Sequence, residues 1–286
     1  MTTSARSGSR ERGPLARIKA ISLLSPDMSG RDARAPRKRQ ALRGIALPVL
    51  LLIAWEAASH LRLIDPRILP PLEQVARTAI VQIVDEDLLY HLAASLVRDA
   101  IGFTIGTVTG IALGTLLGLS RLADRLATPT FNGVRQIAIL AWIPLISIWF
   151  GFGEAAKIAF ISAAALIPVV LNTYEGMRSA SNQLVEVGQT LRFTTPQLIT
   201  KLYLPSALPS ILTGIHLALI YSWVASVGAE YFMTVGPGIG GLIIAGRERF
   251  QMDLVMLGIL ILGLVGFLIN RGASAIEARL LRWRPT

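Results

Sequence analysis

The chain contains no cysteine, which excludes disulfide bonds and thiolate chemistry and leaves the redox compartment undetermined. Its three histidines, His60, His91 and His216, lie too far apart to form a metal-binding pair at helical spacing. The His-Glu-x-x-His pattern of zinc enzymes is also absent. The sequence therefore predicts no metal site.

A phosphate-binding loop of the form Gly-x-x-x-x-Gly-Lys-Ser/Thr is missing as well, so we do not expect the chain to cradle ATP phosphates in that manner. Its titratable residues form no catalytic set. A membrane-embedded enzyme stays open as another class, but it needs titratable groups converging deep in its helices, and the sequence offers few. We expect a chain that is not itself an enzyme and binds no cofactor.

Charged residues are scarce. They make up 16% of the 286 residues, against about 25% in an ordinary soluble domain, while 52% are hydrophobic and the mean hydropathy is +0.56. The formal net charge of +10 fits either nucleic-acid binding or asymmetric membrane loops. The arginines cluster outside the apolar segments, and no basic surface interleaved with aromatic residues is evident. We therefore expect membrane lipid as the surroundings and no nucleic-acid partner.

Six apolar segments are each near the ~20 residues that cross ~30 Å of hydrocarbon. They predict an all-α, polytopic membrane protein with six transmembrane helices in residues 44–270, between an N-terminal tail (1–43) and a C-terminal tail (271–286). The segments are Gly44–Leu63, Leu92–Leu119, Val134–Phe150, Ala155–Tyr174, Ser210–Phe232 and Met252–Asn270.

Lysine and arginine are divided unequally between the two sets of connecting segments. With the N-terminus inside, the cytoplasmic set holds 20 of them and the opposite set holds four. This bias predicts that both termini face the cytoplasm. The cytoplasmic set comprises residues 1–43, 120–132, 175–209 and 271–286, and the opposite set holds Arg67, Arg77, Arg247 and Arg249.

The basic N-terminal residues 1–43 are predicted to be a disordered cytoplasmic tail. Ala20–Leu24 is too short for the apolar core of a signal peptide. An interfacial membrane anchor and an organelle transit peptide remain as alternatives for this tail.

The stretch between the fourth and fifth apolar segments is only half apolar. Ser181 is suited to cap a short helix over Asn182–Leu191, because its hydroxyl accepts a hydrogen bond from an otherwise unpaired N–H. We predict a second helix with Thr195 as N-cap and Pro196 at its first position, where the missing N–H costs nothing. The prolines of Leu204–Pro209 are expected to end it. This predicts a cytoplasmic helix–turn–helix whose apolar side needs a partner.

The same stretch resembles the coupling loop of ABC-transporter permeases, which has Glu-Ala-Ala, a glycine four residues later, and Leu-Pro after a dozen or so more. Glu186 stands at the glutamate and Leu204–Pro205 at the end, while Val187 and Gly188 replace the alanines. Arg192 stands where the glycine would be. Since arginine tolerates positive φ poorly, we expect the tight turn to be altered there.

The resemblance runs from about Arg34 to Pro285 and looks like the branch that imports aliphatic sulfonates, taurine and nitrate, with the sulfonate permeases closest. Besides the loop, three stretches carry it. They are Trp149–Glu154 with Lys157, Leu171–Tyr174 with Gly176, and Leu281–Pro285.

This resemblance implies a type I ABC importer permease of the bacterial inner (plasma) membrane that forms a homodimer around a central pathway. Its partners would be ATP-binding ATPase subunits, which hold the ATP and magnesium, and an extracytoplasmic solute-binding protein. The solute would be a small anion, an aliphatic sulfonate first, with taurine, nitrate or another small solute as alternatives. Glu186 would be the polar anchor on the ATPase, with Leu191, Phe193 and Leu198 as apolar contacts. The predicted coupling loop includes Glu186, Gly188, Leu191, Arg192, Phe193, Leu198, Leu204 and Pro205.

The second apolar segment has glycine at every fourth position. Glycines at that spacing lie on one ridge of a helix and let another helix approach closely. Packing within the chain and a dimer seam are the two interpretations. The ridge comprises Gly102, Gly106, Gly110, Gly114 and Gly118.

Proline interrupts the third apolar segment at Pro144, and we expect a mild kink with this proline as its main cause. The resemblance places this span near the dimer axis, so it is a candidate for the pathway wall. The full set of pathway candidates is Trp142, Pro144, Arg135, Ser222, Ser226 and Glu230.

Several charged or titratable residues fall in or near the apolar segments. A charge at mid-bilayer costs ~2.5–3.5 kcal/mol even on the lenient insertion scale, so such side chains should face protein or water. Structural pairing and a role in the pathway are the alternatives for these residues, and helix packing or ligand binding for His216. The set is Glu56, Arg98, Asp99, Arg135, His216 and Glu230.

The outer connection 64–91 is acidic and contains a predicted short helix over Leu72–Val84. A solvated face and contact with the binding protein both remain open for it. After the fifth segment, Gly236–Gly241 predicts either a turn feeding a short outer helix over Leu242–Ala245 or a plain glycine-rich loop. A secondary transporter remains the other transport class, although the chain lacks the matching halves that class requires.

Overall fold

The computed structural model describes residues 37–61, 63–84, 86–233 and 236–280, and these contain helices and no β-strand. The predicted basic tail up to residue 36 and the Leu281–Pro285 stretch lie outside the described residues. The chain divides into two compact units, residues 1–57 and 58–286. The first contains most of α2 (Arg37–His60), which matches the first predicted apolar segment and exposes Leu47, Leu50 and Ile53 as a lipid-facing helix does.

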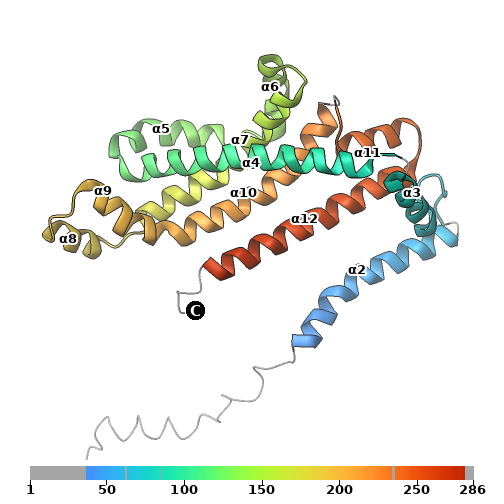
Figure 1. Cartoon of the computed structure of the whole chain (residues 1–286), viewed down its shortest axis with the longest axis horizontal. Helices are drawn as coiled ribbons and strands as arrows, with labels where there is room; N and C mark the ends of the chain where they lie inside the picture. Colours follow the sequence, from blue (N-terminus) through green and yellow to red (C-terminus); the bar gives the residue numbers. More distant parts are fainter. Residues whose placement is uncertain (1–36, 62, 85, 234–235, 281–286) are drawn as a thin grey trace, which may run out of the picture. The chain divides into compact units, whose positions relative to one another are not determined.

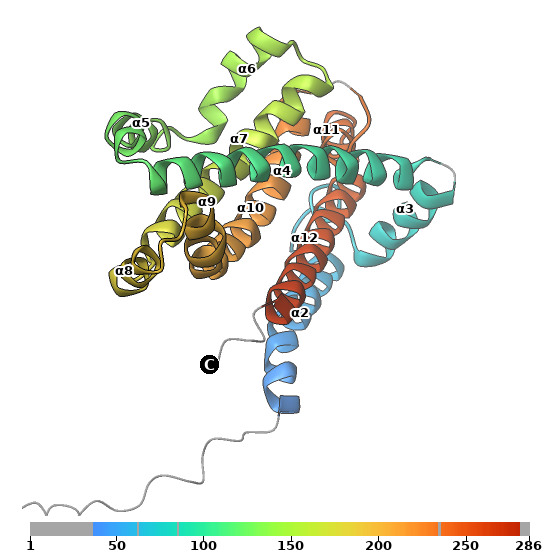
Figure 2. The same ribbon diagram turned by 60° about the vertical axis from the view of Figure 1, so that its left-hand side comes forward.

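Three long helices form the core of the second unit: α4 (Leu88–Leu119), α7 (Glu154–Arg178) and α10 (Leu204–Phe232). α4 packs along α7, and α10 packs along the same α7 (Figure 1, Figure 2). α12 (Met252–Leu280) contacts α10, α11 (Ile239–Glu248) and α3 (Leu72–Val84). α7 is therefore the central element of the unit.

The glycine ridge explains how α4 approaches α7 so closely. A Cβ atom added at Gly110 would lie 2.8 Å from Cβ of Val169, and one at Gly114 would lie 2.6 Å from Cβ of Thr173. All five ridge glycines meet α7 of the same chain in this way. Any side chain larger than hydrogen on this ridge would force the two helices apart.

The third apolar segment is broken rather than mildly kinked. α5 (Arg121–Val134) is followed by a 3-10 turn, η1 (Ile139–Trp142), and α6 (Ile143–Phe150), and the two parts of this span are bent by 95°. The break falls at residues 135–138, where Ala138 has φ −55° and ψ 131° and leaves the helical region. The expectation that Pro144 causes a mild kink is wrong, because this proline sits in the first turn of α6, where a missing N–H is not needed.

The helix–turn–helix forms from α8 (Asn182–Thr190) and α9 (Thr195–Leu198), and Ser181 caps α8 as predicted by accepting from the N–H of Leu184 at 3.3 Å. The cap of α9 is Thr194 and not the predicted Thr195. The reason is Gln197, whose Oε1 accepts from the N–H of Thr194 at 2.9 Å and completes a capping box.

The prolines after α9 do not end the helix, contrary to the prediction. A π-helical turn, η2 (Ile199–Tyr203), joins α9 to α10, and the N–H of Leu204 donates to Ile199 O, five residues back. This wider turn accommodates Pro205, which has no N–H and whose ring would clash with a carbonyl in a regular α-helix. Helical structure therefore continues from Thr195 to Phe232.

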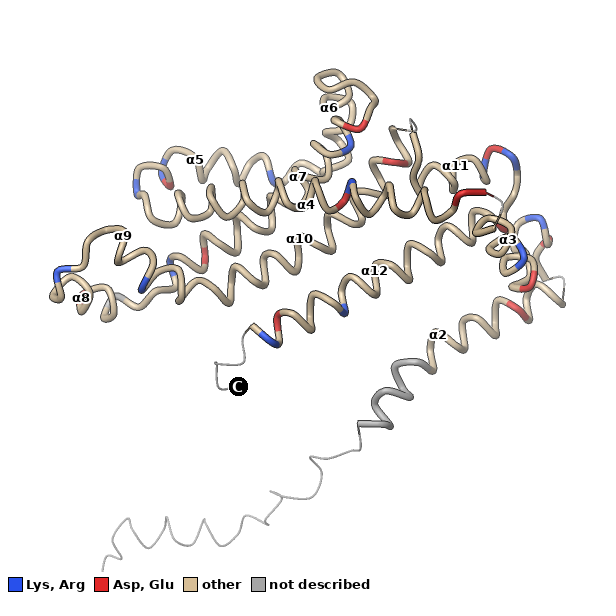
Figure 3. The backbone as a smooth tube through the Cα atoms, in the orientation of Figure 1, with Lys and Arg blue, Asp and Glu red and all other residues tan. Residues whose placement is uncertain are grey.

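Within the part of the chain that the structure describes, four helical stretches are long and apolar enough to cross a membrane: residues 88–119, 154–178, 195–232 and 252–280. The bent pair of α5 with η1 and α6 is a fifth candidate, and α2 has a shorter apolar stretch, Ala46–His60. Each predicted segment thus overlaps one of these stretches, although the third covers η1 and α6 and leaves most of α5 in a predicted connection. α12 continues ten residues beyond its predicted end at Asn270. Figure 3 shows that charged residues in α4, α7, α10 and α12 are few and gather mostly near helix ends.

Gly110→Leu is expected to abolish or strongly reduce the yield of folded protein, because a leucine there collides with Val169 of α7. The measurement is the monodisperse fraction in size-exclusion chromatography after detergent extraction. Ala112→Leu, on an exposed position of the same helix, is the control and should extract like the unchanged chain. Equal yields of both variants would contradict the close contact.

Candidate functional site

The α8 helix presents an apolar face with nothing packed on it in the described structure. Leu184, Val187 and Leu191 are 51%, 55% and 62% exposed. Their spacing of three and four residues places them on one side of the helix. Among the residues predicted for the coupling loop, only Leu191 belongs to this face. Leu184 and Val187 were missed, although the same spacing could have identified them.

Two other predicted loop residues face inward instead. A Cβ atom at Gly188 would lie 2.7 Å from Cδ2 of Leu198 and 3.6 Å from Cδ2 of Phe193, so these two side chains pack on α8. Lys201 lies over the Phe193 ring, 5.3 Å from its centroid. Leu198 and Phe193 therefore hold the helix–turn–helix together.

Arg192 makes the tight turn that was expected to be altered by the missing glycine. Its φ of 53° is left-handed, and the N–H of Phe193 donates to Gly188 O at 3.0 Å. This is a Schellman-type helix end, in which glycine usually takes the left-handed position. An arginine there costs about 1–2 kcal/mol of local strain, which the packing of Phe193 and Leu198 on Gly188 offsets.

The remaining predicted loop residues are exposed. Glu186 lies on α8 and is exposed, and its backbone carbonyl accepts a hydrogen bond from Thr190 Oγ1 at 2.9 Å. Leu204 and Pro205 lie at the start of α10, next to the π turn. The helix–turn–helix thus offers one acidic and three apolar side chains to a partner.

A buried ionic cluster joins α4, α7 and α10. The Arg98 guanidinium, 3% exposed, donates to both carboxylate oxygens of Glu154 at 2.6 and 2.9 Å and forms an ion pair with Glu230. Glu230 is itself 2% exposed, and Lys157 lies 3.4 Å from Glu154. The Glu154 side chain is 53% exposed, so only Arg98, Glu230 and Lys157 are taken out of water. Bidentate pairing with Glu154 offsets the cost of burying the Arg98 guanidinium.

The same cluster fixes the beginning of α11. Arg98 donates to Pro237 O at 2.9 Å, and the N–H of Gly240 donates to Glu230 Oε2 at 2.8 Å. Ser95 donates to Glu230 Oε1 at 2.7 Å and accepts from the N–H of Ile239. The glycine-rich stretch is therefore a turn feeding a helix, α11, which is longer than the predicted Leu242–Ala245.

The charged residues of the apolar segments are used mainly for pairing. Arg98 and Glu230 contact each other, and Glu154, which the sequence did not single out as their partner, completes the set. His216 of α10 lies 2.8 Å from both Glu277 and Asn270 of α12, so it packs two helices together. Asp99 is buried, with one carboxylate oxygen unpaired among the described residues.

Of the six predicted pathway residues, the structure brings Arg135 and Trp142 to one cavity and places the others elsewhere. Ser222, Ser226 and Glu230 are buried inside the helical unit, Trp142 packs against the core around Phe160, and Pro144 is exposed. Arg135 and Trp142 together line an open cavity of about 340 Å³. Arg135 also lines a larger one, of about 540 Å³, between α7, α10 and residues 135–140.

Most of this cavity is apolar, with Phe160, Ile167 and Val224 among its walls. Its polar side chains are Arg135, Gln136, Asn172 and Tyr221. Arg135 Nε is buried and has no hydrogen-bond partner among the described residues. A buried guanidinium nitrogen without a partner is a free donor for an anionic group.

Residues 106–282, from the middle of α4 to beyond the end of α12, match the family described as the binding-protein-dependent transport system inner membrane component. The chain belongs to this family. It is a multi-pass membrane permease and a subunit of an ABC importer. Its fold is that of the type I importer permeases.

Three permease proteins are similar in sequence to this chain over most of its length. It is 35% identical to a Bacillus subtilis chain named for aliphatic sulfonates transport, the permease protein SsuC, over 87% of this chain and 90% of that one. It is 32% identical to the Escherichia coli taurine transport system permease protein TauC, over 87% and 92%. The bicarbonate transport system permease protein CmpB of Synechococcus elongatus is 33% identical over 85% and 92%.

Solved structures show the same fold at lower identity. A chain of the MetNI methionine ABC transporter in an inward-facing conformation superposes with a TM-score of 0.57 at 20% identity, covering 67% of this permease and 95% of that chain. An amino acid ABC transporter solved with histidines gives a TM-score of 0.56 at 16% identity over 73% and 97%.

Arg98→Gln is expected to destabilise the permease by about 3–5 kcal/mol, because it leaves the Glu230 carboxylate buried without its cation. The measurement is the unfolding temperature in detergent. The double variant Arg98→Gln/Glu230→Gln removes both charges and should unfold at a higher temperature than Arg98→Gln alone. Arg77→Gln, in the exposed pair with Glu73, is the control and should change little. A double variant that is less stable than the single one would refute the pairing.

Proposed function

We propose that this permease imports a small anionic solute, and that the solute is an aliphatic sulfonate. Support comes from the names of its relatives, since the SsuC proteins of Bacillus subtilis and Escherichia coli are 35% and 36% identical to it. Taurine carries a sulfonate group, and TauC is nearly as similar, so taurine is the second candidate. Nitrate is a further alternative, because a nitrate import permease of Leptolyngbya laminosa is 34% identical over 69% of this chain.

The proposed coupling to ATP hydrolysis rests on the apolar face of α8. Leu184, Val187 and Leu191 are exposed apolar side chains on a short helix, next to the exposed Glu186. Such a face fits a groove on a partner protein, with the carboxylate as a polar anchor at its edge. The partner we propose is a separate ATPase subunit, which would hold the ATP and magnesium.

Coupling then follows from the helix geometry. Helical structure is continuous from α9 through the π turn into α10, so movement of the docked loop reaches the transmembrane core directly. Closure of two ATPase subunits on ATP would move two such loops in a homodimer and switch the central pathway between its inward- and outward-open states. An extracytoplasmic binding protein would deliver the solute.

This proposal places the permease in the inner membrane of a bacterium, with both termini and α8–α9 on the cytoplasmic side. The unequal distribution of lysine and arginine between the connecting segments supports that orientation. Residues 271–280 would then form a cytoplasmic extension of α12.

The larger cavity beside Arg135 suits an anion with an apolar part. Its walls are mainly apolar, and one end carries a guanidinium with a buried, unpaired N–H. An alkanesulfonate has the same division into a charged head and an apolar tail. Inorganic anions such as nitrate lack the tail and would leave the apolar walls uncovered.

Glu186→Lys is expected to lower ATP-driven solute uptake about tenfold or more, the ratio that corresponds to ~1.4 kcal/mol, because a repulsive charge enters the docking face. The measurement is uptake of ethanesulfonate into proteoliposomes that contain the permease, its ATPase and a sulfonate-loaded binding protein. Glu175→Lys, an exposed charge reversal at the end of α7 outside α8 and α9, is the control and should retain uptake. Normal uptake by Glu186→Lys would refute the docking role.

Arg135→Gln is expected to lower ethanesulfonate uptake about tenfold, because a charge-assisted hydrogen bond to the solute is lost. ATP hydrolysis stimulated by the loaded binding protein should persist, since α8 is unchanged. Arg125→Gln, an exposed arginine on α5, is the control. Unchanged uptake by Arg135→Gln, in liposomes where the unchanged permease is active, would exclude Arg135 from the pathway.

A further inference from the structure

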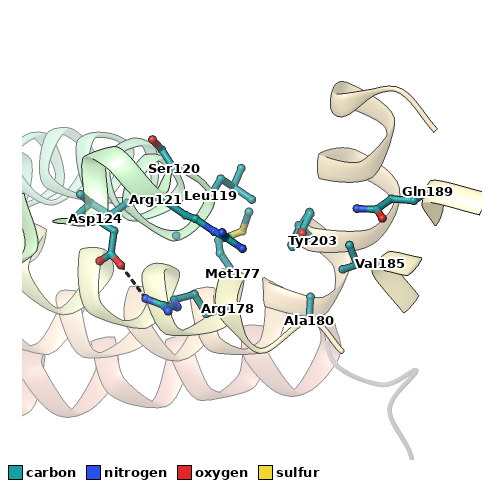
Figure 4. A pocket seen from close by; sticks show the side chains of 12 residues that line it. Leu119, Ser120, Arg121, Asp124, Met177, Arg178, Ala180, Val185, Gln189 and Tyr203 are labelled. Carbon is teal, nitrogen blue, oxygen red and sulfur yellow. Dashed lines mark hydrogen bonds and ion pairs between the residues drawn. The ribbon is translucent and has the colours of Figure 1, made fainter. Parts of the chain in front are cut away.

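A further cavity, of about 450 Å³, lies at the end of the α4–α7 contact that is remote from the ionic cluster, where it also borders α8 and the π turn. Its polar side chains come from several elements and include Arg121, Asp124, Arg178, Gln189 and Tyr203. Figure 4 shows the Arg121 side chain extending from the start of α5 toward Tyr203, with Gln189 and Val185 beyond. We propose that this cavity binds an oxyanion, a phosphate, sulfate or sulfonate group, and that Arg121 is its main ligand.

The acidic residue of the cavity is already neutralised from within the protein. Asp124 Oδ1 accepts from Thr128 Oγ1 at 2.6 Å and from the Tyr174 hydroxyl at 2.9 Å. Asp124 Oδ2 forms an ion pair with Arg178 at 3.0 Å, drawn as the dashed line in Figure 4. The carboxylate is thus committed to three donors, and it does not compete for a further cation.

Arg121 is left without such a partner. Its side chain makes no hydrogen bond or ion pair with any residue that the structure describes, in contrast to that of Arg178 on the same cavity. Its planar guanidinium offers five N–H donors in the geometry that matches two oxygens of a phosphate or sulfonate. With two arginines and one aspartate, the cavity carries an excess positive charge that favours an anion and disfavours a metal cation.

The size of the cavity indicates more than a bare ion. A volume of about 450 Å³ falls in the range of ordinary small-molecule sites, ~300–1,000 Å³. Leu117, Leu119 and Met177 supply an apolar wall beside the arginines. A phosphate ester or short organic sulfonate therefore fits, and so does the headgroup of an anionic lipid with its glycerol.

A ligand here would connect α8 to the core. α8 packs on the end of α9 and on the π turn, through Gly188 against Leu198 and Leu202, and has little other attachment among the described residues. Gln189 of α8 and Arg121 of α5 line opposite sides of the cavity. An anion held by both would bridge the two helices and reduce the local opening of α8.

The test uses the full-length permease in a non-ionic detergent, with Arg121→Gln and the matched control Arg125→Gln, which lies one turn further along α5 and does not line the cavity. The first arm titrates sodium phosphate against sodium chloride at constant ionic strength and follows the unfolding temperature and the hydrogen exchange of residues 182–190. The second arm adds phosphatidylglycerol or phosphatidylcholine and counts the retained lipids by native mass spectrometry. A third variant, Arg121→Lys, keeps the charge and loses the fork geometry.

We expect phosphate to raise the unfolding temperature and slow exchange in α8, with Arg121→Gln needing about tenfold more phosphate for the same effect and Arg121→Lys falling between. This result assigns the site to a free anion. Retention of phosphatidylglycerol that Arg121→Gln loses, with no response to phosphate, assigns it to a lipid headgroup. If Arg121→Gln and Arg125→Gln behave alike in both arms, the proposal is overturned, whatever the transported solute.

Discussion

The close contact between α4 and α7 is the constraint on which the rest of the second unit depends. Five glycines at every fourth position bring the two backbones together, and Arg98 lies four residues before the first of them, on the same ridge. Because of that register, the guanidinium points at Glu154 of α7 and Glu230 of α10 instead of at lipid. At the other end of the ridge, Gly118 and Met177 form one wall of the cavity beside Arg121. One packing contact therefore positions a buried ionic cluster and an open basic cavity at opposite ends.

These two ends differ in how firmly they hold the elements attached to them. The ionic cluster clamps the start of α11 with a guanidinium, a carboxylate, a serine hydroxyl and backbone amides, all buried. α8 is held by the packing of Leu198 and Phe193 on Gly188 and by a strained turn at Arg192. In the proposed function α8 moves with an ATPase subunit, and its weak attachment suits an element with that role.

Much of the fold could be predicted from the sequence, since apolar length, glycine spacing and the Ser181 cap are local signals. The prediction of the glycine ridge required only the period of the helix. The break at 135–138 could not be predicted, because its cause is the extended backbone of Ala138 rather than the visible Pro144. The π turn could not be predicted either, because prolines usually end helices. The wider turn that accommodates them here has no sequence pattern of its own.

The candidate sites were less predictable, because they join residues from different helices. Spacing along α8 could have revealed Leu184 and Val187, which were missed, while Phe193 and Leu198 needed the structure to show that they face inward. The pairing of Arg98 with Glu154 spans 56 residues of sequence and depends on the α4–α7 register. No local pattern distinguishes a buried pathway candidate such as Ser226 from an arginine that lines a cavity, as Arg135 does.

The continuity of α9, the π turn and α10 gives this region the mechanics of a lever. Its 38 residues correspond to a rod roughly 55 Å long at about 1.5 Å per residue, so a tilt of about 5° at one end displaces the other by roughly 5 Å. Glu230 lies near the C-terminal end of α10, where it forms the ion pair with Arg98. The π turn has the least regular hydrogen bonding of this helical stretch, so it is the point where the stretch would bend most easily. Its stiffness would decide how much of a displacement of α9 reaches the end of α10.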